Sequence, residues 1–348
     1  MLMFIARRLL TMLGTAICLT FLVFWLTNLA PNLEKIAKTE AGSRITDAEV
    51  ESWLDKNGFG QPLLVRYGEW LGVLPGWTTT DESGAVRGRC IASGQDPAEA
   101  PRFCGILQGD WGYSRVFRED VASVIGTRLA LTGKLMAWVL VVMVPGALIL
   151  GILAGMREGS RTDRVLSTAS IAITATPEYV SGVVFIAVFT SSAVGLKWFN
   201  GSATSAMDDA NLVNFTLPVL TVALYAMGYV ARMTRASMTE VMTAQYIRTA
   251  RLKGVSFPQV VLRHALRNAL IAPFTVIMLQ IPWLLTGVVI VESLFNYKGF
   301  GWTLVEAAGN NDIELLLGIS VVSVVVVLLT QLISDVGYVY LNPRLRLS

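Results

Sequence analysis

The chain has 348 residues, of which 53% are apolar and 15% are charged, and its mean hydropathy is +0.57. Because soluble domains carry about 25% charged residues, this composition excludes an ordinary soluble domain. The apolar residues fall in blocks of roughly 20, the length that crosses a bilayer core of about 30 Å at 1.5 Å per residue. The sequence therefore predicts an all-α membrane protein.

Six of these blocks are predicted to span the bilayer. The first comes directly after Arg7 and Arg8, and a signal peptide likewise has basic residues before its apolar run. The segment Thr27–Pro31 is a poor cleavage site, so an uncleaved anchor is favoured over a cleaved signal. The six predicted spans are Leu9–Leu29, Leu135–Ala154, Ile171–Val194, Leu217–Met233, Leu270–Val291 and Leu315–Val339.

Basic residues gather on alternate sides of these spans. Each short loop on one side has a single basic residue, Lys197 or Lys298. By the positive-inside rule, the Arg-rich side and both termini are predicted to be cytoplasmic in a multi-pass membrane protein. That side carries Arg7, Arg8, Arg157, Arg161, Arg164, Arg232, Arg235, Arg248, Arg251, Lys253, Arg263, Arg267, Arg344 and Arg346.

The predicted domains are an N-terminal transmembrane helix (1–30), a periplasmic loop or cap (31–128) and a five-helix core (129–348). The loop contains several tryptophans, which favours a small ordered cap. It also holds Cys90 and Cys104, whereas Cys18 lies in the first span. An oxidising compartment would allow Cys90 and Cys104 to form a disulfide, and two free thiols are the alternative.

The connection between the fourth and fifth spans, residues 234–268, is longer than a plain connector needs to be. Its pattern predicts two helices, Met238–Leu252 and Phe257–Ala269. Gly254 suits the left-handed turn that ends the first helix, and Ser256 is expected to cap the second. From composition alone, this hairpin could either lie along the membrane or dock a cytoplasmic partner.

Two stretches within this hairpin, Tyr246–Val255 and Leu262–Leu270, resemble the coupling loop of ATP-binding-cassette importer permeases, and more closely the dipeptide/oligopeptide branch. The general pattern has an EAA triplet four residues before a glycine. Here the triplet is Arg248-Thr249-Ala250 before Gly254, and His264-Ala265-Leu266-Arg267 replaces a later Ile-x-Leu-Pro. Both departures are ones that the peptide branch shows.

Further matches to this branch occur in the same order along the chain. They are Gly109-Asp110-Trp111-Gly112-Tyr113-Ser114, Thr127-Arg128-Leu129-Ala130-Leu131-Thr132, Pro177-Glu178-Tyr179, Leu217-Pro218-Val219-Leu220, Glu292-Ser293-Leu294-Phe295 with Gly299-Phe300-Gly301, and Asn342-Pro343-Arg344. The resemblance covers nearly all of the chain except about residues 36–108. It implies six transmembrane helices of the type I importer kind in a bacterial inner membrane, with a large periplasmic loop between the first two.

The resemblance also implies the partners. A second homologous permease would complete a heterodimer, two ATP-binding subunits would attach on the cytoplasmic side, and a periplasmic binding protein would deliver a peptide or related solute. No cofactor is expected in this chain, with ATP and Mg²⁺ on the partner subunits, and no nucleic-acid partner is expected. The chain would be a pore subunit and not an enzyme.

Residues of the matched segment are the predicted coupling site. Ala250 and Gly254 would allow close backbone approach to an ATPase, and Arg248, Arg251 and Lys253 would give polar contacts at the rim. The segment also contains Thr249, Val255 and His264.

Catalytic and metal sites are not expected. No Gly-x-x-x-x-Gly-Lys-Ser/Thr phosphate-binding loop occurs, so hydrolysis would belong to another subunit. The single histidine excludes a multi-histidine metal cage.

Polar groups inside spans usually line a path or a contact. Glu178 and, more weakly, Gln280 are therefore candidates for the translocation path. An interfacial helix-start residue next to Pro177 is the alternative for Glu178. Glu292 and Asp335 are expected at span ends within reach of water, in structural roles.

Two other functions compete with an importer. An ion-coupled secondary transporter would place acids within the spans and often has inverted repeats, of which the sequence shows none. A membrane hydrolase would need a serine with a base inside the bilayer, but the only histidine lies in a loop. The sequence does not choose among dipeptides, oligopeptides, nickel complexes, glutathione and oligosaccharides, and peptides are favoured by family frequency alone.

Overall fold

The computed structural model describes residues 2–42, 44–80, 84–91, 95–192 and 196–341. The predicted motif Asn342-Pro343-Arg344 and the basic residue Arg346 lie outside the described residues. The chain divides into two compact units. One consists of Met1–Thr127 with Leu304–Val325, and the other of Arg128–Thr303 with Val326–Ser348. We refer to them as the first and second unit. The predicted domain boundaries at residues 30 and 128 stay predictions.

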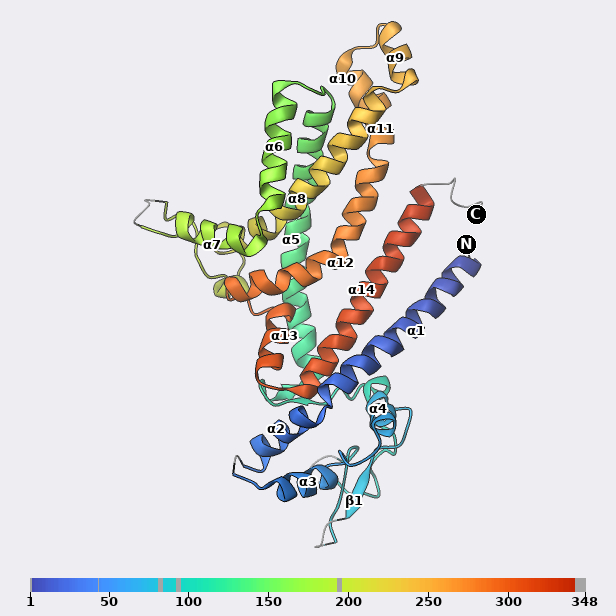
Figure 1. The fold of residues 1–348 in the computed structure, drawn as a ribbon, viewed down its shortest axis with the longest axis vertical. Helices are drawn as coiled ribbons and strands as arrows, with labels where there is room; N and C mark the ends of the chain where they lie inside the picture. The colour runs from blue at the N-terminus through green and yellow to red at the C-terminus, as the bar shows by residue number, and fades with distance from the viewer. Residues whose placement is uncertain (1, 43, 81–83, 92–94, 193–195, 342–348) are drawn as a thin grey trace. The chain divides into compact units, whose positions relative to one another are not determined.

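Helices dominate both units (Figure 1). The first unit contains α1 (Leu2–Thr27), α2 (Ala30–Glu40), α3 (Asp47–Lys56), α4 (Leu63–Leu71) and the short helix η1 (Ile106–Gln108). Two small antiparallel sheets join β1 (Thr78–Thr80) to β2 (Val86–Gly88) and β3 (Tyr113–Ser114) to β4 (Glu119–Asp120).

Three helices pass from one unit into the other along the chain: α5 (Val121–Gly155), α13 (Phe300–Gly309) and α14 (Ile313–Leu341). The remaining elements belong to the second unit. They are α6 (Arg161–Ala175), α7 (Glu178–Phe189), η2 (Thr204–Ala206), α8 (Leu212–Met242), α9 (Gln245–Leu252), α10 (Phe257–Gln259), the π-helical segment η3 (Val260–Ala265), α11 (Leu266–Ala269) and α12 (Ile271–Leu294).

Four described helices are long and apolar enough to cross a membrane: α1, α5, α8 and α14. Two further pairs of helical segments are each bent at a short break: α6 with α7, and Phe257–Ala269 with the first part of α12. The number of candidate spans is six if each of these pairs is one span. The apolar blocks of the sequence therefore correspond to helices, although α5 begins fourteen residues before the predicted start at Leu135. The structure is that of a helical membrane protein, as the composition predicts.

The prediction of a single third span, Ile171–Val194, is wrong as a continuous helix. Helix α6 ends at Ala175, α7 begins at Glu178, and the two axes differ by 101°. Thr176 has an extended backbone because the residue before a proline is disfavoured in the α conformation, and Pro177 then precedes α7. Figure 1 shows α7 leaving the direction of α6.

A cap of three helices follows α1 in the first unit. Thr46 begins α3 with a capping box, in which its hydroxyl and the Glu49 carboxylate each accept a hydrogen bond from the other residue's backbone N–H. Phe24 of α1 packs on Tyr67 and Trp70 of α4, and the Thr20 hydroxyl lies 2.8 Å from the Tyr67 hydroxyl. These contacts fasten α4 to α1.

The motif at residues 109–114 fastens the loop to the start of α14. The Tyr113 backbone N–H donates to the Glu314 carboxylate at 2.7 Å, and the Ser114 hydroxyl donates to Asp312 at 2.7 Å. A Cβ atom at Gly112 would lie 2.1 Å from a Glu314 oxygen. Glycine is thus required at position 112 by this close approach as well as by its φ of +83°.

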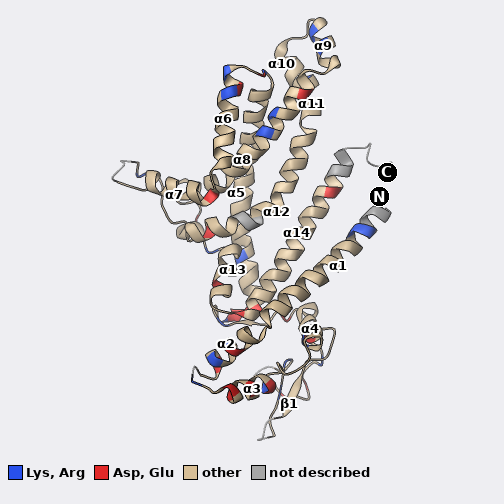
Figure 2. Ribbon diagram, in the orientation of Figure 1, with Lys and Arg blue, Asp and Glu red and all other residues tan. Residues whose placement is uncertain are grey.

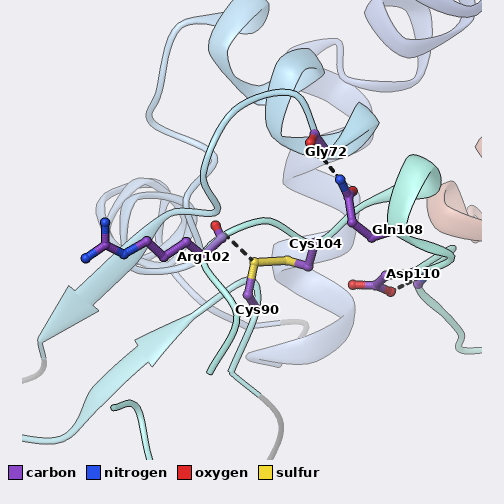
Figure 3. The surroundings of a disulfide bond; sticks show 7 residues. Gly72, Cys90, Arg102, Cys104, Gln108 and Asp110 are labelled. Atoms are coloured by element: carbon purple, nitrogen blue, oxygen red, sulfur yellow. Dashed lines mark hydrogen bonds between the residues drawn. A yellow bond between two sulfur atoms is a disulfide. The ribbon is translucent and has the colours of Figure 1, made fainter. Parts of the chain in front are cut away.

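A disulfide joins Cys90 to Cys104 in the cap, with the two Cα atoms 5.5 Å apart (Figure 3). Beside it, the Arg102 carbonyl accepts a hydrogen bond from the Gly76 backbone N–H at 3.0 Å. The Gln108 side chain donates to the Gly72 carbonyl at 3.0 Å. These links hold the segment after β2 against the end of α4.

The second unit has a continuous apolar core between α5, α8 and α12. Leu135 and Val139 of α5 and Leu284 of α12 are fully buried in it. Helix α5 also approaches α8 closely, since a Cβ atom on Gly151 would lie 2.3 Å from the Thr234 Cβ. A Cβ on Gly155 would lie 2.5 Å from the Met238 Cβ. Small residues spaced by four thus let the two helix backbones pack together.

Candidate functional site

The segment after α8 forms a small helical hairpin, α9 to α11 (Gln245–Ala269), at one end of α8 and α12 (Figure 1). The predicted first helix, Met238–Leu252, is wrong at its start, because α8 continues to Met242 and α9 begins only at Gln245. Ser256 lies before α10 in an extended conformation but makes no side-chain capping hydrogen bond, contrary to prediction. We call this segment the hairpin.

The turn of the hairpin depends on Gly254, whose φ is +77° as the predicted left-handed turn requires. The Val255 N–H donates to the Ala250 carbonyl at 3.2 Å, and the Gly254 N–H donates to the Arg251 carbonyl at 3.0 Å. These two bonds form the Schellman motif that ends a helix at a left-handed residue. A Cβ atom at position 254 would meet nothing within 4 Å, so backbone conformation and not space explains the glycine.

The hairpin has its own apolar core. Ile247, Val260 and Ala265 are fully buried in it, together with Met238 of α8. Ala250 is 8% exposed and belongs to the same core. Its side chain therefore helps to pack the hairpin, and its predicted role in close backbone approach to a partner stays a prediction.

Polar contacts fix the hairpin to its surroundings. The Ser237 hydroxyl of α8 donates to the Ala269 carbonyl at 2.8 Å, and the Asn268 side chain donates to the Tyr246 hydroxyl at 2.9 Å. The Arg157 guanidinium lies 5.0 Å from the centre of the Phe257 ring, a cation–π contact. With these links and its core, the hairpin is suited to move as one body with the end of α8.

The outer surface of the hairpin combines basic residues with exposed large apolar side chains, of which Leu252 and Leu262 are the most exposed. Arg248, Thr249, Arg251, Lys253 and Gly254 are exposed, whereas Val255 and His264 are half-buried. Lys and Arg residues also gather at the start of α6 and on the part of α8 near the hairpin (Figure 2).

Leu252 was missed by sequence reasoning, although it is 81% exposed beside these basic residues. Helical periodicity could have found it. Ile247 and Ala250 define the inward face of α9, and position 252 lies well away from that face.

Asp163 near the start of α6 forms a second polar link that the sequence did not single out. Its carboxylate is 2% exposed and accepts hydrogen bonds from Arg235 Nη2, the Gly159 backbone N–H and the Ser167 hydroxyl at 2.8–3.0 Å. The Arg235 Nε also donates to it at 2.5 Å. Because Arg235 is on α8, this bidentate pair joins α6 to the helix that leads into the hairpin.

Glu292 is completely buried, so the expectation that water reaches it is wrong. One carboxylate oxygen accepts from the Thr132 hydroxyl of α5, and the other accepts from the Trp302 backbone N–H at 2.8 Å. The Thr132 hydroxyl oxygen in turn accepts from the Phe300 N–H at 2.8 Å. A Cβ atom on Gly299 would lie 2.2 Å from the carboxylate, which explains a glycine there.

Glu178 and Gln280, the predicted path residues, lie on different helices and are both half-buried. Glu178 begins α7 directly after the bend, and its Oε2 atom is buried without a hydrogen-bond partner among the described residues. Gln280 lies on α12, two residues before Pro282. Within the described part of the chain, His, Cys, Asp and Glu side chains form no group of three or more that could hold a metal ion.

These features define the class of the protein: a membrane-spanning helical protein that carries a compact basic hairpin between two long helices, α8 and α12. Residues 147–347 match the model of the family described as "binding-protein-dependent transport system inner membrane component". The chain belongs to this family and is the permease subunit of an ATP-binding-cassette importer. This membership removes the ion-coupled transporter as a competing function.

Curated relatives extend the match to nearly the full length. The chain is 30% identical to the oligopeptide transport system permease protein OppB of Mycobacterium bovis, over 99% of both chains. It is 30% identical to the glutathione transport system permease protein GsiC of Escherichia coli over 99% of both, and 28% identical to AppB, an oligopeptide permease of Bacillus subtilis, over 98% of both. Among solved structures, a chain of an amino acid ABC transporter with histidines has a TM-score of 0.47, with 17% identity over 62% of this chain and 94% of that chain.

Proposed function

We propose that this subunit imports short peptides and that the hairpin receives the movement of a cytoplasmic ATP-binding subunit. The exposed side chain of Leu252, set among Arg248, Arg251 and Lys253 on a hairpin with its own core, is the observation that carries this proposal. An apolar side chain with a basic rim fits a docking contact, whose buried centre is apolar and whose edge is polar.

Rigidity of the hairpin supports the coupling role. A floppy loop would absorb a displacement, whereas short helices packed on Met238 and Val260 pass it on to α8. From α8, the Arg235–Asp163 pair passes it to α6. ATP hydrolysis would take place in the partner subunits, which would hold the nucleotide and Mg²⁺.

The peptide class is inferred from the relatives, several of which are named as oligopeptide permeases and one as a glutathione permease. Glutathione is itself a tripeptide, so these names share one chemical class. The remaining parts of the proposal are a second permease in a heterodimer, two ATP-binding subunits, a periplasmic binding protein, and cytoplasmic termini in the inner membrane.

We also propose that Glu178 and Gln280 face the translocation path. The buried, unpartnered Oε2 atom of Glu178 supports this, since buried polar atoms normally have a hydrogen-bond partner. The bend before α7 leaves this carboxylate at the beginning of a helix, where an approaching solute amine would be attracted to it.

The test is ATP-dependent peptide uptake into proteoliposomes that hold the complete transporter and its binding protein. Leu252→Asp is expected to lower uptake about tenfold or more, because a charge replaces the centre of an interface. Its level in the membrane should not change, since the side chain is outside the hairpin core.

Leu252→Met is the matched control and should retain uptake, because it keeps an apolar side chain of similar size. Wild-type uptake in Leu252→Asp would remove the coupling role of this surface. If uptake by the wild-type transporter followed an ion gradient without ATP, or if no peptide were taken up, the proposed function would be refuted.

A further inference from the structure

A cavity of about 1200 Å³ lies in the first unit, among the cap helices, the segment around the disulfide and the start of α14. Its walls are rich in aromatic side chains, which include Trp53, Phe59, Trp70, Trp77 and Phe103. Ligand pockets are typically about 300–1000 Å³ and mostly apolar with a few polar groups, so this cavity is large enough for a small solute.

Charged groups of both signs line the same cavity. Arg66 and Arg89 contribute positive charge, and Glu69 and Glu314 contribute carboxylates. Glu69 is only 4% exposed. Burial raises the pKa of the Glu69 carboxyl, and the nearby Arg89 opposes that effect. A cation entering the cavity would therefore stabilise the ionised form of Glu69.

Arg89 offers an open donor in this cavity. Its Nε atom is buried and has no hydrogen-bond partner among the described residues. The residue is held in place at both sides, because its backbone N–H donates to the Trp77 carbonyl at 3.0 Å and the next residue is the disulfide-bonded Cys90. A guanidinium fixed in this way is positioned to donate a charge-assisted hydrogen bond to the carboxylate of a ligand.

We propose that this cavity is a peptide-binding site of the permease itself. The peptide binds as a zwitterion, with its carboxylate on Arg89 and its ammonium group facing Glu69. Its side chains lie against the tryptophan walls. This inference rests on the proposed function for the class of solute, but it assigns a separate site, in a unit that does not contain the hairpin.

The experiment measures equilibrium binding of the radiolabelled tripeptide Ala-Phe-Ala to the full-length permease chain in detergent, without the solute-binding protein. Wild type should bind it saturably. Arg89→Gln and Glu69→Gln should each weaken binding about tenfold or more, the usual effect of removing a charge-assisted contact. The C-terminally amidated tripeptide should bind wild type as weakly as the free tripeptide binds Arg89→Gln.

Arg102→Gln is the matched control. It removes the same charge from an exposed side chain that points away from the disulfide (Figure 3) and is not part of the cavity lining. Binding by this variant should equal that of wild type. Thiol titration, which should find Cys90 and Cys104 oxidised in every variant, shows that the cap has folded.

Three results would overturn the site. They are absence of saturable binding to wild type, equal binding by wild type and both cavity variants, and equal binding of the free and amidated tripeptides. If the binding protein's own surface fills the cavity, the chain alone will not bind the tripeptide, and the cavity variants will weaken attachment of the binding protein instead.

ATP-driven uptake separates this inference from the proposed function. A transporter that takes up the tripeptide although its permease chain does not bind it would refute only the cavity site. A chain that binds the tripeptide in a complete transporter that does not take it up would refute only the proposed substrate class.

Discussion

At the scale of single residues, two buried carboxylates connect helices of this molecule, which the low content of charged residues does not indicate. Asp163 is almost completely buried and Glu292 completely buried, and each accepts a hydrogen bond from a residue far away in the chain, Arg235 or Thr132. A buried carboxylate is costly unless such donors surround it. Both side chains therefore act as fixed polar links between helices.

Replacing Glu292 by alanine tests this role. The substitution leaves the Trp302 N–H and the Thr132 hydroxyl without their acceptor, and we expect a loss of about 2–4 kcal/mol in the free energy of unfolding. The measurement is the unfolding transition of the purified chain in detergent. Glu240→Ala, at an exposed glutamate near the end of α8, is the control and should change stability little. An unchanged transition in Glu292→Ala would show that the buried network contributes nothing to stability.

At the scale of helices, the close packing of α5 on α8 depends on glycines. A Cβ atom on Gly151 would also lie 2.6 Å from the Ala231 carbonyl oxygen, which is backbone and cannot rotate away. Gly133 is on the same helix, but a Cβ atom there would meet nothing within 4 Å.

We expect Gly151→Ala to destabilise the chain by about 1–3 kcal/mol, because the two helices must separate. Gly133→Ala should be neutral or stabilising by up to about 1 kcal/mol, since alanine favours the helix. The midpoints of thermal unfolding of the two variants in the same detergent compare these effects. Equal midpoints would mean that α5 and α8 do not pack through this face.

The sequence predicts where helices lie better than it predicts where they bend. A run of about 20 apolar residues suffices to place a span. By contrast, Pro177 marks a break without giving its angle, which depends on how α7 packs against α8 and α12. The end of α8 at Met242 was missed because the residues around it are compatible with a continuous helix.

Only those features of the candidate site that depend on a local sequence pattern could be predicted. The left-handed turn at Gly254 follows from the residue type, and the hairpin follows from the loop length and the family pattern. The burial of Glu292 could not be predicted, since its partners Thr132 and Trp302 come from other helices. The inward position of Ala250 and the exposure of Leu252 likewise depend on how the hairpin packs.

At the scale of the whole molecule, the distribution of charge predicts the direction of insertion. Single cysteines at two exposed positions, Lys253 of the hairpin and Glu99 of the cap, can test it in a Cys18→Ser background. A membrane-impermeant maleimide should label Glu99→Cys in intact spheroplasts, whereas Lys253→Cys should need permeabilised membranes. Labelling of Lys253→Cys from outside would reverse the orientation.

The bonds from Tyr113 and Ser114 to Glu314 and Asp312 join residues 201 and 198 positions apart. During synthesis, the earlier partners leave the ribosome long before the later ones exist. The first unit therefore cannot reach its final form until the last spanning segment has been made. A nascent chain stopped before residue 312 should still be cut by protease within residues 109–120, so biogenesis of this unit is completed late and not in the order of the sequence.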